Sequence, residues 1–209
     1  LKAEEELKNY QFLMFVNANM VCDDYVYSKE FLPDIKRGEK LFFTKHPGYC
    51  KEKPWNTPLD RNKKSSAYIP YNRGNIYVIG ALFGGYTESF LEMTRTLDER
   101  ICEDLKRGII AKWHDESHIN HYILKKNNCR LLSAGYCYPV GFMIDEKKKI
   151  SAVPKADKFN VNEFKGYYNI SSRNEYWLSI LKRILNKMHP VKMKICVFRD
   201  FLLRREIAQ

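Results

Sequence analysis

Two neighbouring carboxylates and two imidazoles lie within six residues of this chain, in the segment Trp113-His114-Asp115-Glu116-Ser117-His118. The apolar residues that follow, Ile119, Tyr122 and Ile123, have helical spacing, so a helix can pack on the core while its first turn faces a cleft. A helix N-terminus tolerates adjacent negative charges that would otherwise repel each other. The segment predicts a carboxylate site at a helix start; alternatively, Asp115 only caps the helix and the histidines are surface residues.

The histidines of this region permit a second kind of chemistry. His114, His118 and His121 are spaced i, i+4 and i+7, and imidazoles at this interval can bind zinc from one helix face, together with Asp115. The order of residues is not the HExxH pattern, and the sequence suggests no fourth ligand. A zinc hydrolase is therefore an alternative that requires these side chains to converge.

The elements that must position this segment begin with a nearly continuous apolar run at residues 10–16. Such a run predicts a buried strand of the kind found in parallel sheets. It leads into Asn17-Ala18-Asn19, and ligands of open α/β sheets bind beyond the carboxyl ends of the strands. We therefore expect the two asparagines near a ligand. At 209 residues and 44% hydrophobic composition, the chain can bury one good core.

Local patterns predict the remaining elements. They are strands within 40–50 and at 67–70, 76–79 and 130–133, and a helix over 86–108. The first of these strands ends in His46-Pro47-Gly48-Tyr49. Residues 51–66 are polar and basic with two prolines, which predicts a mobile surface loop. Gly80, Gly84 and Gly85 predict a close approach of the backbone to another group, although their spacing fits neither a dinucleotide fingerprint nor a phosphate loop.

Charge and cysteine content limit the classes of partner. The formal net charge is +11, and residues 163–209 hold ten Lys or Arg against four Asp or Glu. This concentration indicates an anionic partner, either membrane lipid or nucleic acid, or else a solvated basic surface. The charge is not interleaved with aromatic residues and no nucleic-acid-binding motif is present, so we expect no nucleic-acid partner. Six scattered cysteines without a CxxC pair favour reduced thiols and a cytoplasmic location.

The basic region 163–209 also has its own hydrophobic pattern. Apolar residues recur at helical spacing from Tyr176 to Met188, with Lys182, Arg183 and Lys187 elsewhere around the helix. A basic amphipathic helix with a tryptophan is typical of membrane-surface binding, and it is equally compatible with packing on the core. No apolar run approaches the roughly 18–20 residues that span a bilayer. We therefore expect an amphipathic helical tail, for which peripheral contact with the inner face of the membrane and packing on the core are the two alternatives.

Taken in order, the landmarks resemble one family, the retaining glycosyltransferases of family 6, which include blood-group A and B transferases, α1,3-galactosyltransferases and bacterial relatives. The resemblance covers roughly residues 10–160. The matching segments are Asn17-Ala18-Asn19, His46-Pro47-Gly48-Tyr49, Ala67-Tyr68-Ile69-Pro70, Phe83-Gly84-Gly85, residues 113–118, Leu132-Ser133-Ala134-Gly135-Tyr136 and Ala152-Val153-Pro154-Lys155. The resemblance implies an α/β, GT-A-type mixed sheet flanked by helices. We expect a partial catalytic domain at 1–162, with the family's N-terminal nucleotide-binding strands missing, followed by the tail at 163–209.

The resemblance also implies roles for individual residues. Glu116 matches the catalytic glutamate, proposed in the family as a nucleophile or as a stabiliser of an oxocarbenium-like transition state. Asp115 matches the aspartate that holds hydroxyls of the donor sugar. His46, Trp113 and His114 match the acceptor side, where the indole offers an apolar face to a sugar. Lys155 matches a lysine that neutralises the diphosphate leaving group.

Two departures from the family pattern concern the diphosphate. Mammalian members have Asp-x-Asp where this chain has Asn17 and Asn19, and neutral amides bind divalent cations far less well than carboxylates. Bacterial members that resemble this sequence share the change and are metal-independent. We therefore expect no metal and no cofactor, and we expect Lys155 to hold the diphosphate. Val161 stands near the place of the family's arginine, so Lys158 is expected to hold the diphosphate in place of that arginine. Asp23 and Asp24 lie beyond the strand and are expected to be solvated.

The resemblance implies that the segment Ile79-Gly80-Ala81 influences the choice of donor sugar. In the blood-group enzymes, Leu-Gly-Gly at this place accompanies an N-acetylgalactosamine donor and Met-Gly-Ala a galactose donor. The methyl group of Ala81 should crowd an acetamido group, so the donor is expected to be UDP-galactose. One methyl group contributes only about 1–3 kcal/mol of discrimination, and UDP-N-acetylgalactosamine remains the alternative.

These inferences converge on one expected activity. It is retaining, metal-independent transfer of galactose from UDP-galactose to the 3-hydroxyl of a terminal galactoside, with or without fucose. The acceptor would be an oligosaccharide or glycolipid of a bacterial surface glycan or lipopolysaccharide. The alternatives are N-acetylgalactosamine transfer, a non-catalytic relative that binds glycans, and the zinc hydrolase.

Overall fold

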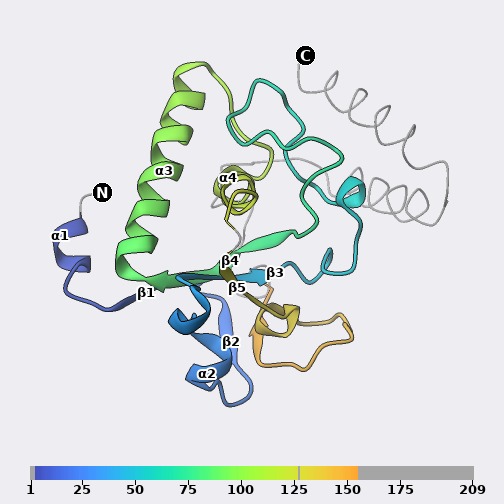
Figure 1. The fold of residues 1–209 in the computed structure, drawn as a ribbon. Helices are drawn as coiled ribbons and strands as arrows, with labels where there is room; N and C mark the ends of the chain where they lie inside the picture. Colours follow the sequence, from blue (N-terminus) through green and yellow to red (C-terminus); the bar gives the residue numbers. More distant parts are fainter. Residues whose placement is uncertain (1–2, 127, 155–209) are drawn as a thin grey trace, which may run out of the picture. The chain divides into compact units, whose positions relative to one another are not determined.

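A four-stranded mixed sheet forms the centre of the described structure, a computed structural model that describes residues 3–126 and 128–154. The strand order is β1 (Phe12–Val16), β4 (Val78–Tyr86), β3 (Leu41–Lys45) and β5 (Cys129–Leu132). β4 is antiparallel to both of its neighbours, whereas β3 and β5 are parallel. Figure 1 views this sheet edge-on, with helices on one side and a second layer on the other. The expectation of a mixed sheet flanked by helices is confirmed at the level of an α/β fold.

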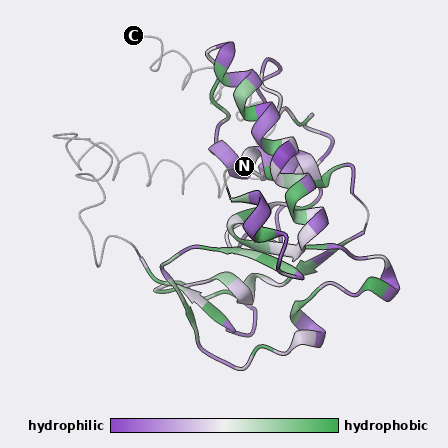
Figure 2. Cartoon of the chain, turned by 90° about the vertical axis from the view of Figure 1, so that its left-hand side faces the viewer, coloured by the Kyte–Doolittle hydropathy of each residue, from purple (hydrophilic) through white to green (hydrophobic). Residues whose placement is uncertain are grey.

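Two helices, α3 (Thr87–Lys106) and α4 (His114–Ile123), cover one face of the sheet. The helix predicted over 86–108 is therefore confirmed. Between helices and sheet lies a cluster of buried apolar residues: Leu41, Phe43, Val78, Phe83, Met93, Leu97, Ile119 and Tyr122. Figure 2 shows both hydrophilic and hydrophobic residues along the long helix, as expected when one face packs and the other meets solvent.

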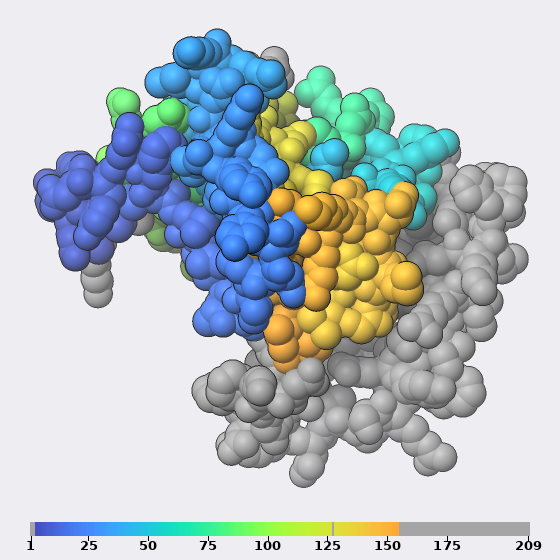
Figure 3. Space-filling view, turned by 90° about the horizontal axis from the view of Figure 1, so that it is seen from below, coloured from blue at the N-terminus to red at the C-terminus, as the bar shows by residue number. Residues whose placement is uncertain are grey.

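The other face of the sheet carries a smaller layer. It contains α2 (Ser28–Phe31) and a three-stranded sheet in the order β2 (Met20–Cys22), β7 (Ile150–Ala152) and β6 (Tyr138–Pro139). The space-filling view in Figure 3 shows this side, where blue N-terminal residues lie against orange residues from the end of the described part. The remaining short elements are α1 (Glu4–Leu7), η1 (Ile35–Arg37), η2 (Pro54–Asn56) and η3 (Ala134–Cys137).

The apolar run at residues 10–16 was predicted as a buried, parallel strand, and that prediction is wrong. β1 is antiparallel to β4 and lies at the edge of the sheet, where the described residues provide it with a neighbour on one side only. Met14, Phe15 and Val16 keep 52%, 41% and 44% of their surface exposed. An apolar run shows that a segment is hydrophobic, but it does not show how many strands lie beside it. That number depends on contacts with residues distant in the sequence.

The segment at 51–66 is also not the predicted surface loop, because several of its side chains are buried. Leu59 and Asp60 are nearly inaccessible. The guanidinium of Arg61 donates to the carbonyls of Pro54, Ile69 and Pro70, which draws this segment together. No strand forms at 67–70. A guanidinium group, planar and with several N–H donors, can hold together irregular backbone that a sequence pattern predicts to be mobile.

Gly84 allows β1 and β3 to approach β4 closely, as the glycine pattern predicted. A Cβ atom added there would lie 2.5 Å from the Leu13 carbonyl oxygen and 2.7 Å from the Phe42 ring. The strand predicted at 76–79 begins at Val78 and continues to Tyr86, so these glycines lie within it. The strands predicted within 40–50 and at 130–133 are confirmed as β3 and β5.

Within the described residues, no helix is both long and apolar enough to cross a membrane. The predicted tail at 163–209 lies outside the described residues, as do Lys155 and Lys158. The domain boundary, the membrane contact and the missing nucleotide-binding strands stay predictions.

Candidate active site

A wide bulge in β4 creates the centre of the candidate site. The register with β3 passes from Phe43 opposite Phe83 directly to Thr44 opposite Ile79, so residues 80–82 have no partner on β3. The Thr44 hydroxyl donates to the Leu82 carbonyl at 2.9 Å and holds the bulge from within the core. Bulges of this kind release backbone groups from the ladder, and they are common beside active sites.

The released backbone N–H of Gly80 donates to Glu116 Oε2 at 2.8 Å. The Tyr77 hydroxyl donates to Glu116 Oε1. Both oxygens of this half-buried carboxylate are therefore held by donors from the segment 77–80, which lies 36–39 residues earlier in the chain. Burial raises the pKa of Glu116, and the two hydrogen bonds oppose that rise.

Asn120, one turn after Glu116, fixes α4 to β4. Its side-chain amide accepts from the Val78 N–H and donates to the Val78 carbonyl, both at 2.9 Å. It also donates to the main-chain carbonyl of Glu116 at 2.9 Å. Asn120 is 1% exposed, so these bonds form without competition from water. The amide acts as a substitute strand partner and sets the position of Glu116 over Gly80.

His46 reaches the same region from the end of β3. Its backbone N–H donates to the Tyr77 carbonyl at 2.9 Å, and its ring lies 5.4 Å from the Tyr77 ring, measured between centroids. Nδ1 of His46 accepts a hydrogen bond from the Gly48 N–H at 3.0 Å. Burial lowers the pKa of His46 to about 4. The imidazole is therefore neutral near pH 7, with its proton on Nε2.

The asparagine turn reaches the bulge from the other side. The backbone N–H of Asn17 donates to the Ala81 carbonyl at 3.0 Å, so the predicted donor residues Asn17, Gly80 and Ala81 are contiguous. Asn19 Nδ2 donates to the Val153 carbonyl at 2.6 Å, and the Val153 N–H donates back to the Asn19 carbonyl at 2.9 Å. Asn19 is thereby joined to the segment that continues into Lys155.

The first turn of α4 presents the rest of the motif. Trp113, 48% exposed, is the N-cap residue, and its N–H donates to the Ser117 hydroxyl oxygen. His114 and Asp115 are exposed in the first helical turn. The alternative in which Asp115 is only an N-cap is wrong, since it lies inside the helix. His114 has a φ of 50°, in the left-handed region that is uncommon for residues other than glycine.

The zinc alternative required three histidines to converge, and they do not. His114 is exposed, His118 is 2% exposed, and His121 Nδ1 lies 2.9 Å from the Tyr68 carbonyl oxygen. No group of three or more His, Cys, Asp or Glu in the described part of the chain has an arrangement that could hold a metal. On a regular helix the i, i+4, i+7 spacing places three side chains on one face. Here His114 has a φ of 50°, and the three imidazoles meet solvent, core and a neighbouring loop.

The asparagine turn offers amide groups and no carboxylate. The Asn19 amide nitrogen is occupied by the Val153 carbonyl, which leaves Oδ1, a single neutral oxygen with no hydrogen-bond partner among the described residues. Asp23 is exposed, as predicted, and Asp24 is partly exposed. At the surface Asp23 forms an ion pair with Lys148 at 2.8 Å and Asp24 with Lys147 at 2.7 Å. A hard cation needs several oxygen ligands, commonly carboxylates, and this turn does not supply them.

Sequence reasoning missed the residues that hold Glu116 in place, namely Tyr77 and Asn120. No motif marks them, because their partners lie on other elements. The sequence offers one usable signal: Tyr77 lies two residues before the Ile79-Gly80-Ala81 segment that the resemblance had singled out.

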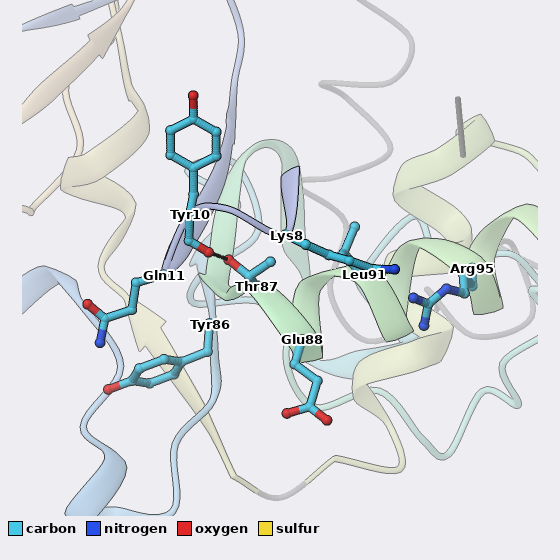
Figure 4. Close-up of a pocket in the computed structure, with 8 residues that line it drawn as sticks. All are labelled: Lys8, Tyr10, Gln11, Tyr86, Thr87, Glu88, Leu91 and Arg95. Carbon is cyan, nitrogen blue, oxygen red and sulfur yellow. Dashed lines mark hydrogen bonds between the residues drawn. The ribbon is translucent and has the colours of Figure 1, made fainter. Parts of the chain in front are cut away.

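A separate pocket of about 470 Å³ lies at the opposite end of β4. Figure 4 shows its lining residues, Lys8, Tyr10, Gln11, Tyr86, Thr87, Glu88, Leu91 and Arg95. The Thr87 hydroxyl donates to the Tyr10 carbonyl there, which ties the start of α3 to the residues before β1. The pocket contains none of the predicted site residues.

Comparison with known proteins shows a match to the model of glycosyltransferase family 6 over residues 3–164. Histo-blood group ABO system transferase 1 from Rattus norvegicus is 36% identical over 140 residues, 65% of this chain and 40% of the rat protein. Globoside alpha-1,3-N-acetylgalactosaminyltransferase 1 from Gallus gallus is 38% identical over 136 residues, 65% of this chain and 38% of that protein. O-antigen biosynthesis glycosyltransferase WbnI from Escherichia coli is 31% identical over 150 residues, 72% of this chain and 62% of WbnI. The chain thus spans about two fifths of the length of these animal relatives.

Proposed function

This chain belongs to glycosyltransferase family 6, and on that premise we propose that it carries the catalytic carboxylate of a retaining hexosyltransferase. The proposed reaction moves galactose from UDP-galactose to the 3-hydroxyl of a terminal galactoside. The observation that carries the proposal is the fixed Glu116 carboxylate, at a bulge where the asparagine turn, the Ile79-Gly80-Ala81 segment and His46 meet. Sugar transfer passes through a positively charged, oxocarbenium-like state, and a fixed carboxylate in a partly desolvated site stabilises such charge.

The other residues of the candidate site have distinct proposed roles in binding the donor and the acceptor. Asp115, exposed in the same helical turn, holds hydroxyls of the donor sugar, and Trp113 offers its exposed ring to the acceptor. His46 acts as a hydrogen-bond donor to the acceptor, because its Nδ1 lone pair is taken by the Gly48 N–H and only Nε2–H remains free to bond. Lys155 and Lys158 are proposed to neutralise the diphosphate.

The names of relatives support the coarse class of substrate, a nucleotide sugar and a glycan acceptor. The match to an O-antigen biosynthesis glycosyltransferase supports an acceptor of the lipopolysaccharide type. The match to an α1,3-N-acetylgalactosaminyltransferase supports N-acetylgalactosamine as the alternative donor sugar. The donor is therefore best tested directly.

Replacing Ala81 with glycine is expected to raise the use of UDP-N-acetylgalactosamine relative to UDP-galactose about 10-fold or more, because removal of one methyl group opens space for the acetamido group. Ala81 is buried beside the asparagine turn, so the space it fills is not otherwise available to solvent. The measurement is kcat/KM for both donors with one fucosylated galactoside acceptor. Ala111→Gly, at a buried alanine before α4, is the matched control. An unchanged donor ratio would overturn the role of Ala81.

Removal of divalent cations with EDTA is expected to leave at least about 80% of the transferase activity, because the asparagine turn offers neutral amides in place of carboxylates. Release of UDP is measured in EDTA and again with added Mn²⁺. The control is a Mn²⁺-dependent glycosyltransferase in the same assay, which EDTA must inactivate. Strict dependence of this protein on Mn²⁺ would contradict the proposed metal independence.

A further inference from the structure

The Tyr77 side chain contacts both the carboxylate and the histidine of the candidate site. Its hydroxyl donates to Glu116 Oε1, its carbonyl accepts from the His46 N–H at 2.9 Å, and its ring packs against the His46 ring. From these contacts we infer that Tyr77 is a positioning residue, whose hydroxyl fixes the Glu116 carboxylate while its ring and main chain hold His46. This inference rests on the proposed function of Glu116.

The surroundings of Tyr77 leave its ring little freedom to move. Tyr77 is 3% exposed and packs in a cluster with Leu59 and Ile69. The Tyr49 ring lies edge-on to it, with centroids 5.4 Å apart. A phenol held in this way has already lost its rotamer freedom in the folded protein. Formation of its hydrogen bond to Glu116 therefore costs little further conformational entropy.

The direction of the hydrogen bond is fixed by the chemistry of the pair. Burial and the charge of Glu116 both raise the pKa of Tyr77 above its ordinary value, so the phenol keeps its proton and acts as the donor. Glu116 meets two further groups that titrate. Asp115 on its own helix raises the pKa of Glu116, and Cys137 of η3 is a neutral thiol because burial raises its own pKa to about 11. Tyr77 and the Gly80 N–H thus favour the charged form of Glu116 against burial and Asp115.

The orienting role has a consequence for catalysis. With Oε1 held by Tyr77 and Oε2 held by Gly80, the plane of the carboxylate is set relative to the bulge. Without the phenol, one oxygen loses its donor and the carboxylate can rotate about its last torsion, which is a soft one. Misplacement of a reacting group lowers the rate of the chemical step more than it lowers substrate affinity.

The test is Tyr77→Phe, which keeps the ring and removes only the hydroxyl. We expect kcat to fall about 10- to 100-fold while KM for donor and acceptor changes less than about threefold, since His46 and its packing remain. The acid limb of the kcat profile should move to higher pH, because loss of a donor disfavours the charged carboxylate. Tyr86→Phe, on the same strand at the far end from Glu116, is the matched control and should leave both quantities unchanged.

A second measurement keeps this inference separate from the proposed activity. Titration of the Glu116 carboxyl group by ¹³C NMR in the whole protein should give a higher pKa in Tyr77→Phe than in wild type and an unchanged value in Tyr86→Phe. If wild type transfers no hexose, the proposed function fails, and the carboxyl titration still decides the role of Tyr77. An unshifted Glu116 pKa, or a lowered kcat with an unmoved acid limb, would overturn the inference and leave Tyr77 a packing residue.

Discussion

Glu116→Gln is expected to lower kcat for hexose transfer by at least about a thousandfold, because the amide keeps the shape of the side chain but removes its negative charge. The amide also brings an NH₂ group to a place where both oxygens now accept from donors, Tyr77 and the Gly80 N–H. One of those donors would then face another donor. The Kd for UDP should change less than about threefold, since binding of the nucleotide is not expected to depend on the Glu116 charge.

The measurement combines turnover, followed as UDP release in the presence of acceptor, with calorimetric UDP binding. Glu99→Gln, at an exposed position of α3, is the control for a loss of one negative charge and should keep wild-type turnover. Wild-type activity itself should fall as the pH drops through the pKa of Glu116, which burial raises, because only the ionised form carries the charge. Near wild-type turnover in Glu116→Gln would remove this residue from the mechanism.

Gly84→Ala should destabilise the fold by about 3 kcal/mol, a substantial part of the about 5–15 kcal/mol that stabilises a typical domain. The new methyl carbon would lie 2.5 Å from the Leu13 carbonyl oxygen and 2.7 Å from the Phe42 ring. Phe42 is 1% exposed and packs within the second core cluster, so it cannot move aside without displacing neighbours. The loss is measured as the change in the free energy of unfolding in denaturant.

Gly80→Ala provides the contrast on the same strand. A Cβ atom there would lie 3.2 Å from the Glu116 Cβ, 3.5 Å from its Oε2 and 3.6 Å from its Cα, so Glu116 needs to shift by a few tenths of an ångström. We expect a loss of stability below about 1 kcal/mol together with lowered activity, because the shift displaces the carboxylate. Equal unfolding midpoints for Gly84→Ala and wild type would contradict the close approach of β1 and β3 to β4.

Local patterns in the sequence predicted those elements whose apolar residues follow a regular pattern within a short segment. The helix at 87–106 and the strands at 41–45 and 129–132 follow from the spacing of apolar residues, which a short window contains. The same method failed for β1, whose hydrophobicity resembles that of a buried strand although it lies at an edge. It failed also for 51–66, where Arg61 organises backbone that has no periodic pattern.

By itself, the sequence determined the chemical groups available and the family. Glu116, His46 and the asparagine pair are recognisable because side-chain chemistry and motif order are properties of the chain. The tertiary structure alone decided how those groups are held. The β4 bulge frees the Gly80 N–H for Glu116, and Asn19 turns its amide toward Val153, 134 residues away. Hydrogen bonds between distant segments depend on register and on which neighbours are brought close, and no local window of sequence contains that information.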